Sequence, residues 1–425
     1  MLNEAPAASD TRHVLAKRAA ILFVNFFLII LAYYQVKSAS RSLLIEYWGS
    51  GKLPYVWIVS ALVLGSFIGV YHRLVERHSR FRIVLGSLLA FMALLVVFRL
   101  LLALGAGARW AAFAFYIFVD IFSVILVEQF WSLANTVNRA GEGKKSYWFV
   151  GTGGLLGGGA GGWAAARLLE WTPMTTPDLL LSCAAILGLT LALNLAMGRL
   201  GLYAEVRGGG RPVVESGGWR ALAGNRYIVL IAAALFCAQL AEPVVEFQFL
   251  SAVEAAYPVM DERTVFIGDF FGLLSIVAIA VNLVLTPVIH RYLGFVAGLL
   301  VQPVAVAVFT LGFMAMPVLW VAAAMKIGDR GLSYSINRAS KEQLYIPIDP
   351  IHTYQAKAWI DMLGYRLFKV AGSALILLLT QWLPLGLGPA QLGWLTLVIC
   401  LAWILVIARL AREYASFAPA PAAAQ

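Results

Sequence analysis

The chain has 425 residues, of which 61% are hydrophobic and 13% are charged, and its mean hydropathy is +0.82. Soluble globular proteins carry about 45–50% apolar and about 25% charged residues, so this chain has about half of the charge expected of that class. Its apolar residues form runs of about 20 residues, long enough to span a bilayer. The composition therefore excludes a soluble protein and predicts an integral membrane protein.

Apolar runs follow one another along almost the whole sequence, separated by short polar segments. The longest separator, residues 201–224, contains Arg207-Gly-Gly-Gly-Arg-Pro212 and has the composition of a flexible linker. We predict cytoplasmic tails at 1–16 and 411–425, an N-terminal half at 17–200 and a C-terminal half at 225–410. The predicted transmembrane helices are residues 17–44, 54–72, 82–104, 110–136, 146–169, 178–198, 226–252, 264–289, 292–315, 317–337, 355–383 and 390–409.

The net charge of +10 has its explanation in the loops. If both termini are inside, 21 Lys and Arg residues lie in cytoplasmic segments and seven lie outside. Cytoplasmic loops of membrane proteins carry such an excess of Lys and Arg. The charge pattern therefore predicts twelve spans with both termini in the cytoplasm, and it gives no reason to expect a nucleic-acid partner.

A short motif occurs twice. Thr136-Val-Asn-Arg-Ala140 resembles Ser335-Ile-Asn-Arg-Ala339, with 199 residues separating Asn138 from Asn337. This offset places span four on span ten and span five on span eleven, in the same orientation. Two parallel six-helix halves joined by a long cytoplasmic loop are typical of the major facilitator fold. The predicted fold class is an all-α polytopic membrane protein of twelve helices with this architecture.

Glycines crowd the fifth predicted span, where Gly157–Gly162 satisfies the pattern G-x-G-x-x-G. A dinucleotide site with that pattern needs a preceding strand in a βαβ unit, whereas these glycines lie within an apolar span. Gly154, Gly158 and Gly162 recur every four residues, which is the pattern of close contact between membrane helices. We interpret them as a packing surface.

Other motifs of enzymes are also missing. Gly143-Lys-Lys-Ser146 resembles the end of a phosphate-binding loop, but Asn138 stands where the first glycine of that loop belongs. The three cysteines, Cys183, Cys237 and Cys400, lie in apolar segments without metal-ligand spacing and are expected to be small buried residues. We predict no enzyme, no cofactor and no metal site.

Ionisable residues within the predicted spans are the main candidates for function, because a charge in the bilayer is costly unless it faces a cavity or a partner. Glu242 and Glu246 are four residues apart, as are Lys326 and Arg330, so each pair shares a helix face. The functional interpretation is a cavity with cations that contact an anionic substrate and carboxylates that serve in coupling or gating. The alternative is ion pairs that only hold helices together, and Asp120 is as well explained by that structural role. The candidate substrate contacts are Lys37, Arg41, Lys326, Arg330, Arg366 and Lys369, and the candidate coupling or gating residues are Glu128, Glu242, Glu246, Asp329, Asp361, Arg139 and Arg338.

Two long blocks carry a resemblance to a known family. Residues 130–162, FWSLANTVNRAGEGKKSYWFVGTGGLLGGGAGG, and residues 333–374 resemble the span four–five and ten–eleven signatures of the bacterial and plastid ATP/ADP translocases. Tyr33-Tyr34-Gln-Val-Lys37 with Arg41 is similar to the family's span one, although its basic pair is spaced by four residues instead of three. The resemblance implies nucleotide exchange, with basic groups that hold phosphates and acidic groups, including Glu128 in span four, that take part in the exchange cycle.

The expected function is secondary transport by alternating access, with exchange of nucleotides such as ATP and ADP or of a related phosphorylated anion. Two alternatives stay open: a proton-coupled transporter or exporter of another organic anion or amphiphile, and a membrane scaffold without transport activity. The protein is expected to be a monomer in the bacterial inner membrane, with a small anionic substrate as its partner.

Overall fold

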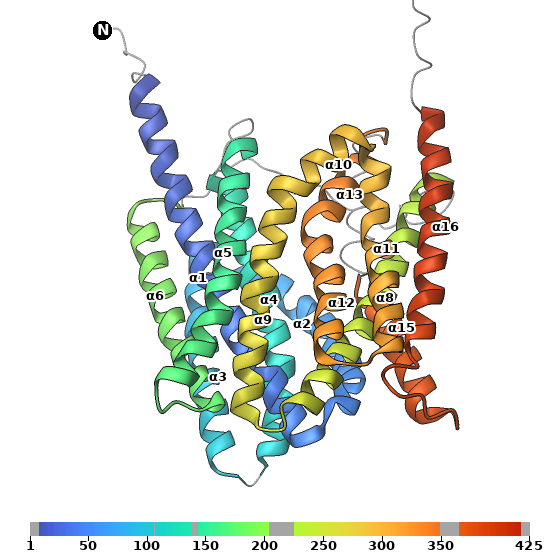
Figure 1. Cartoon of the computed structure of the whole chain (residues 1–425). Helices are drawn as coiled ribbons and strands as arrows, with labels where there is room; N and C mark the ends of the chain where they lie inside the picture. The colour runs from blue at the N-terminus through green and yellow to red at the C-terminus, as the bar shows by residue number, and fades with distance from the viewer. Residues whose placement is uncertain (1–7, 106, 138–142, 204–224, 349–364, 418–425) are drawn as a thin grey trace, which may run out of the picture. The chain divides into compact units, whose positions relative to one another are not determined.

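The computed structural model describes residues 8–105, 107–137, 143–203, 225–348 and 365–417. Throughout these ranges the elements are helices, without a strand (Figure 1). By length and apolar composition, nine of the described helices are able to cross a membrane, and a further apolar helix at Leu367–Trp382 is shorter. The protein is an all-α integral membrane protein, as predicted.

Each of the twelve predicted spans corresponds to one helix or to a series of helical segments. The N-terminal half contains α1 (Ala8–Trp48), α2 (Leu53–Arg77), α3 (Arg80–Ala103), α4 (Ala108–Val137), α5 (Gly143–Trp171) and α6 (Leu179–Arg199), with short turns η1 (Ser50–Lys52) and η2 (Thr176–Asp178). The C-terminal half contains α8 (Arg226–Ala256), α9 (Met260–Ala280), η3 (Val281–Leu285), α10 (Thr286–Tyr292), α11 (Gly294–Ala315), α12 (Leu319–Leu332), η4 (Ser333–Asn337), α13 (Arg338–Leu344), α15 (Tyr365–Leu377), η6 (Leu378–Trp382) and α16 (Gly393–Phe417).

Three of the predicted spans contain a π-helical turn, and these turns are η3, η4 and η6. A π-turn holds one residue more than an α-helical turn, and such turns occur frequently at functional sites. Span ten is therefore a composite of α12, η4 and α13, and it runs to Leu344, beyond the predicted end at residue 337. Likewise α1 begins at Ala8, within the segment predicted as a tail.

The described residues fall into two compact units. The first draws on Met1–Trp48, Val63–Gly209 and Val259–Ser275, and the second on Gly49–Leu62, Gly210–Pro258 and Ile276–Gln425. These units follow the two halves of the sequence except in α2 and α9. The first part of α2 belongs to the second unit, and the first part of α9 belongs to the first unit.

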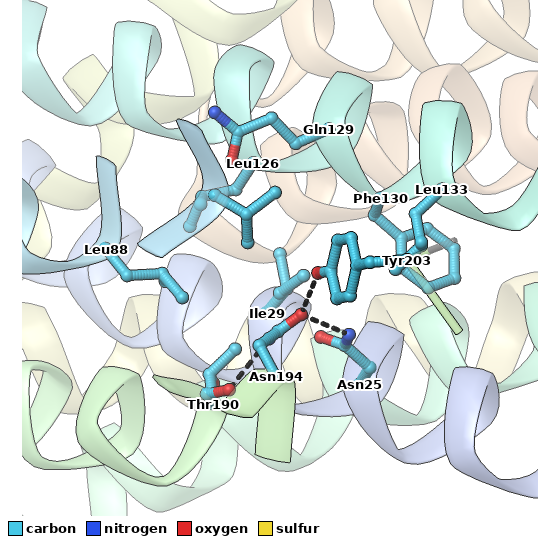
Figure 2. Close-up of a pocket in the computed structure, with 11 residues that line it drawn as sticks. Asn25, Ile29, Leu88, Leu126, Gln129, Phe130, Leu133, Thr190, Asn194 and Tyr203 are labelled. Atoms are coloured by element: carbon cyan, nitrogen blue, oxygen red, sulfur yellow. Dashed lines mark hydrogen bonds between the residues drawn. The ribbon is translucent and has the colours of Figure 1, made fainter. Parts of the chain in front are cut away.

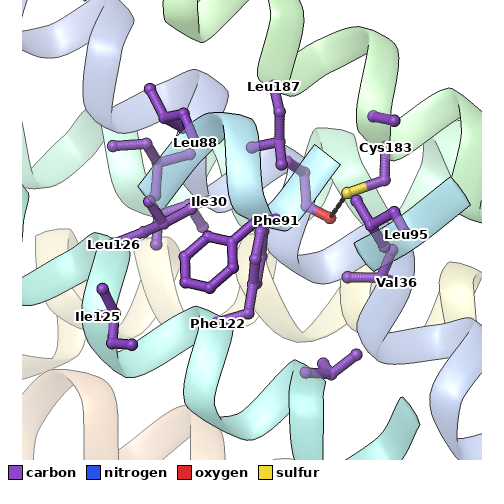
Figure 3. Close-up of a cluster of buried hydrophobic side chains, with 14 of the residues drawn as sticks. Ile30, Val36, Leu88, Phe91, Leu95, Phe122, Ile125, Leu126, Cys183 and Leu187 are labelled. Atoms are coloured by element: carbon purple, nitrogen blue, oxygen red, sulfur yellow. Dashed lines mark hydrogen bonds between the residues drawn. The ribbon is translucent and has the colours of Figure 1, made fainter. Parts of the chain in front are cut away.

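The core of the first unit is built from α1, α3, α4 and α6 (Figure 3). Phe91 and Phe122 are buried in it, and their rings meet edge to face with centroids 5.4 Å apart. Such aromatic pairs add to the stabilisation that comes from burial. Cys183 lies in this core with its Sγ 3.5 Å from the carbonyl oxygen of Ala32. Its burial, and that of Cys237 and Cys400, confirms the prediction for the cysteines.

The glycines of α5 let it approach the backbone of α1. A Cβ atom on Gly157 would lie 2.5 Å from the carbonyl oxygen of Phe27, and one on Gly153 would lie 2.9 Å from that of Phe23. Gly161 faces the carbonyl of Leu31 in the same way. The packing interpretation is thus confirmed, but the stripe against the α1 backbone begins one residue before the predicted one. On the predicted stripe, Gly162 packs closely against α9.

Candidate functional site

Lys37 of α1 lies within the first unit, and its side chain is surrounded by aromatic rings. The Lys37 Nζ is 4.5 Å from the ring centroid of Tyr34, 4.6 Å from that of Phe271 and 5.3 Å from that of Tyr33. A ring face attracts a cation, and the attraction strengthens where water is excluded. Because Lys37 is only 9% exposed, the rings stabilise a charge that the bilayer would otherwise disfavour.

Arg41 lies one turn further along α1 and shares one of these rings. Its Cζ is 5.6 Å from the ring centroid of Phe271 and 5.8 Å from that of Tyr116, and its Nη1 donates to the carbonyl of Lys37 at 3.3 Å. The predicted basic pair of span one is therefore one local group. Aromatic rings flank both cations.

A second charged group lies within the second unit, where α8 faces α12. Arg330 contacts Glu242, and the Lys326 Nζ lies 2.8 Å from the Glu246 Oε2. The Lys369 Nζ of α15 lies 3.9 Å from the other oxygen of Glu242. The two predicted i,i+4 pairs therefore contact each other: Glu242 and Glu246 of α8 bind Arg330 and Lys326 of α12.

Asp329 completes this group from α12 itself. Its Oδ2 lies 3.3 Å from the Lys326 Nζ and 3.7 Å from the Arg330 Nε. Its Oδ1 accepts a hydrogen bond of 3.2 Å from the Gln302 Nε2 of α11. Both oxygens of this buried carboxylate, which is 2% exposed, have partners, as buried charges require.

We call the six charged residues Glu242, Glu246, Lys326, Asp329, Arg330 and Lys369 the ion cluster. It holds three carboxylates and three cations. A charge taken out of water is costly, and removing one member of such a pair leaves the other unbalanced. An anion that binds these cations must therefore take the place of a carboxylate oxygen, so ligand binding here would exchange one ion pair for another.

The remaining candidates are less well defined. Glu128 of α4 is exposed, and its charge acts on Tyr71 of α2. Arg338 is exposed at the start of α13, next to η4. Arg139, Asp361 and the side chain of Arg366 lie outside the described residues.

Sequence reasoning missed two uncharged members of the site. Gln302 of α11 donates to Asp329, and its Oε1 accepts a 2.6 Å hydrogen bond from the Asn337 Nδ2 of η4. The available signal was weak: Gln302 is a single carboxamide in the otherwise apolar stretch 294–309. Asn337 was noticed as part of the repeated motif, but nothing in the sequence indicated its partner.

A pocket beside the middle of α1 is too small to be the substrate site. It lies within the first unit and has about 10 Å³ for the centre of a water molecule, which is room for about one water. Asn25, Asn194 and Tyr203 form hydrogen bonds along its wall (Figure 2). Hydrogen bonds among its polar side chains join α1 to α6 at this point.

At the connection between α5 and α6, one carboxylate is tied down by hydrogen bonds. The amide N–H and the hydroxyl of Thr175 both donate to the Asp178 Oδ2, at 2.9 and 2.7 Å. The Arg99 Nε donates to the Asp178 Oδ1 at 2.8 Å. This pair joins α3 to the turn η2 within the first unit.

Comparison with known proteins adds to these observations. The model of the TLC ATP/ADP transporter family matches residues 217–327 and 316–414. The ADP,ATP carrier protein 1 of Chlamydia muridarum is 26% identical to this chain, over 96% of this chain and 92% of the carrier. The chain is thus similar to an ADP,ATP carrier over almost its whole length. The chloroplastic ADP,ATP carrier protein 1 of Arabidopsis thaliana is 24% identical, over 72% of this chain and 55% of that protein.

Solved structures show the fold independently. A bacterial homologue of the iron transporter ferroportin, in an inward-facing state, matches with a TM-score of 0.64 at 14% identity, over 93% of this chain and 98% of the other. A POT family transporter in complex with a peptide conjugate matches with a TM-score of 0.66 at 11% identity, over 95% and 97%. These transporters share the major facilitator architecture, which confirms the predicted fold class.

Proposed function

We propose that the protein is a secondary transporter that exchanges nucleotides such as ATP and ADP, or closely related phosphorylated anions, by alternating access. The observation that carries the proposal is the ion cluster, in which buried Lys326 and the partly buried Arg330 and Lys369 lie among three buried carboxylates, in a chain similar to the ADP,ATP carriers. Phosphate groups favour Lys and Arg because their contacts are charge-assisted. A carrier of this kind performs no covalent chemistry.

The proposed roles follow from the charges. Cations contact the substrate, and the carboxylates that hold these cations in the empty carrier are displaced when the substrate binds. Arg139 and Arg338, the arginines of the two copies of the repeated motif, are proposed as gate residues. The proposed substrate contacts are Lys37, Arg41, Lys326, Arg330, Arg366 and Lys369, and the proposed coupling carboxylates are Glu128, Glu242, Glu246, Asp329 and Asp361.

The test is counterflow in liposomes that contain the purified protein. Vesicles preloaded with ADP or ATP are expected to take up labelled ATP much faster than empty vesicles, because an exchanger needs a substrate on the far side. Lys52→Ala, at an exposed cation beside Gln381, serves as the matched control and should exchange normally. Absence of counterflow with every nucleotide, in a preparation where a Chlamydia carrier is active, would overturn the proposal.

The buried carboxylates support a second candidate, a proton-coupled transporter of another organic anion. Glu242, Glu246 and Asp329 each contact a cation and each could take a proton when that cation turns to a substrate. This candidate predicts uptake that depends on a pH gradient, stops with a protonophore and is lost in Glu242→Gln. Exchange that is insensitive to the protonophore would rule it out.

We further propose that the protein acts as a monomer in the bacterial inner membrane, with both termini in the cytoplasm. The threefold excess of Lys and Arg in the segments assigned to the inside supports this orientation.

A further inference from the structure

Gln302 uses all of its polar atoms in contacts that join two parts of span ten. Its Nε2 donates to the Asp329 Oδ1 at 3.2 Å and to the carbonyl oxygen of Asp329 at 3.0 Å, and its Oε1 accepts from the Asn337 Nδ2 at 2.6 Å. Gln302 is 2% exposed and Asp329 is 2% exposed. Each unsatisfied polar group within a membrane costs several kcal/mol. The position of a buried carboxamide is therefore fixed by the groups that bind its nitrogen and its oxygen.

The π-turn η4 explains how Gln302 reaches both residues. Asn337 follows Asp329 by eight residues. In a straight α-helix, eight residues make two turns and about 80°, so the two side chains would lie about 80° apart around the axis. The extra residue of the π-turn sets this rotation back by about 100°, so the two side chains lie within about 20° of each other. Only with the π-turn present do Asp329 and Asn337 face the same side chain of α11.

The π-turn also loosens backbone hydrogen bonds, and nearby side chains satisfy the carbonyls. The amide N–H of Ser333 is shared between the carbonyls of Asp329 and Arg330, and Gln302 supplies the former with a second donor. The Ser335 Oγ donates to the carbonyl of Gly331 at 2.6 Å. These bonds stabilise the turn, as is required wherever a helix in a membrane departs from its regular pattern.

We propose that Gln302 is a positioning residue that couples the π-turn of span ten to the ion cluster. With the turn in place, Gln302 holds the Asp329 Oδ1, so that the Oδ2 faces Lys326 and Arg330. Conversion of the turn to a regular α-helix rotates α13 by about 100° relative to α12, separates Asn337 from Gln302 and releases Asp329. The assembly of the cluster and the orientation of α13 are thereby linked.

Ser340 of α13 reports on this rotation. It is fully buried, and its Oγ lies 2.8 Å from the His290 Nε2. A Cβ atom on Gly298 of α11 would collide with it, so α13 and α11 touch here. Rotation of α13 removes Ser340 from this contact. Because all three native cysteines are buried, Ser340→Cys provides a thiol whose labelling by a water-soluble maleimide can be followed without removing them.

The experiment compares labelling in the Ser340→Cys background, in detergent and without substrate. Gln302→Leu, which keeps the size of the side chain and removes its polar atoms, is expected to speed labelling about tenfold, because local opening of a buried site sets the rate. Asn337→Leu should have the same effect from the other end. The double variant should label no faster than either single variant, since both remove one connection.

Thr310→Val is the matched control. Thr310 is also buried in α11, and its Oγ1 donates to the carbonyl of Val306 in its own helix and lies 3.4 Å from the Met325 Sδ of α12, four residues before Asp329. It should leave labelling unchanged. Labelling at the parent rate in both Gln302→Leu and Asn337→Leu would overturn the proposal, and so would additive effects in the double variant. If one single variant does not fold, the labelling rate of the other against the parent still tests the proposal.

A transport measurement extends the test and rests on the proposed function. Nucleotide counterflow by Gln302→Leu, without the reporter cysteine, is expected to fall about tenfold, because Asp329 is no longer held towards Lys326 and Arg330. If the parent protein exchanges no nucleotide while labelling still responds to Gln302→Leu, the proposed substrate is wrong and the coupling stands. Normal counterflow in Gln302→Leu would overturn the coupling.

Discussion

Lys326 is a cation with two carboxylate partners and almost no exposure to solvent. Lys326→Met leaves Glu246 buried without its cation at 2.8 Å, and breaking a buried pair in this way costs about 3–5 kcal/mol. We therefore expect Lys326→Met to lower the apparent melting temperature of the purified protein strongly. The double variant Lys326→Met/Glu246→Gln removes both charges and should recover most of the loss. Thermal unfolding followed by tryptophan fluorescence measures the difference.

The same pair of variants separates a structural role from a transport role. If Lys326 contacts the substrate, nucleotide counterflow stays lost in the double variant although its melting temperature has recovered. Recovery of counterflow together with stability would mean that Lys326 only balances Glu246. Lys52→Met, at an exposed cation, should change neither quantity and serves as the control.

Much of the charged site could be predicted because charge is conspicuous within apolar sequence. The spacing of Glu242 and Glu246 predicted one shared face, and both contact α12. Gln302 could not be found in this way, because a single carboxamide in an apolar span has no characteristic pattern. Its importance depends on Asp329 and Asn337, which lie 27 and 35 residues away in the sequence.

At the scale of helices, the glycine face of α5 predicts that an added side chain destabilises the protein. Even the smallest side chain at position 157 would collide with the carbonyl of Phe27. Gly157→Ala should therefore destabilise the protein by about 1–3 kcal/mol, the typical cost of overpacking. Melting of the purified variant, compared with the parent chain, measures the effect.

Gly151→Ala on the same helix is the control, because nothing lies within 4 Å of a Cβ atom built there. Replacing glycine by alanine within a helix generally stabilises it by up to about 1 kcal/mol. Equal melting temperatures for Gly157→Ala and Gly151→Ala would contradict the close approach of α5 to α1.

Sequence pattern located the helices but not their rotation or their irregularities. The repeat of small residues in α5 was visible, yet Gly153, Gly157 and Gly161 meet the α1 backbone rather than the stripe one residue later. Two glycine stripes lie side by side in the sequence, and composition does not indicate which one a neighbour approaches. The π-turns were not predicted either, because their residues, such as Ser333–Asn337, have ordinary helical composition.

For the molecule as a whole, the direction in which the chain crosses the membrane can be tested. A fusion of green fluorescent protein after Phe417, beyond α16, is expected to fluoresce in bacteria, because twelve spans return the chain to the cytoplasm. Alkaline phosphatase fused after Met174, between α5 and α6, is expected to be active, since that segment is assigned to the outside. The opposite pair of results would reverse the orientation, and a mixed pair would contradict the seven spans predicted between the two fusion sites.

Exposed tryptophans lie at several helix ends in both units. Trp110, Trp171, Trp320 and Trp394 are all 64–76% exposed, and each lies at a helix end that the charge count places outside. Tryptophan is enriched where a membrane meets water. In each unit, the described ends on that side therefore have the aromatic side chains of an interface.

The architecture was predictable at this scale because the bilayer restricts the possible structures to a few. The twelve apolar runs and the repeat around Asn138 and Asn337 predicted a major facilitator fold, which the solved transporters confirm. The sequence did not predict where the compact units divide the chain. The first parts of α2 and α9 group with the unit that does not contain the rest of their helix, and linear sequence carries no information on such exchanges.

The contact between the backbones of α1 and α5 also restricts motion. Helices separated by side chains can slide by a change of rotamers, whereas backbones in direct contact leave no such freedom. We expect α1 and α5 to move as one rigid body, with Lys37 and Arg41 carried along at a fixed position relative to Gly157. Any rearrangement of the first unit during transport must then take place at its other helix faces, where side chains separate the backbones and can change rotamer as the helices move.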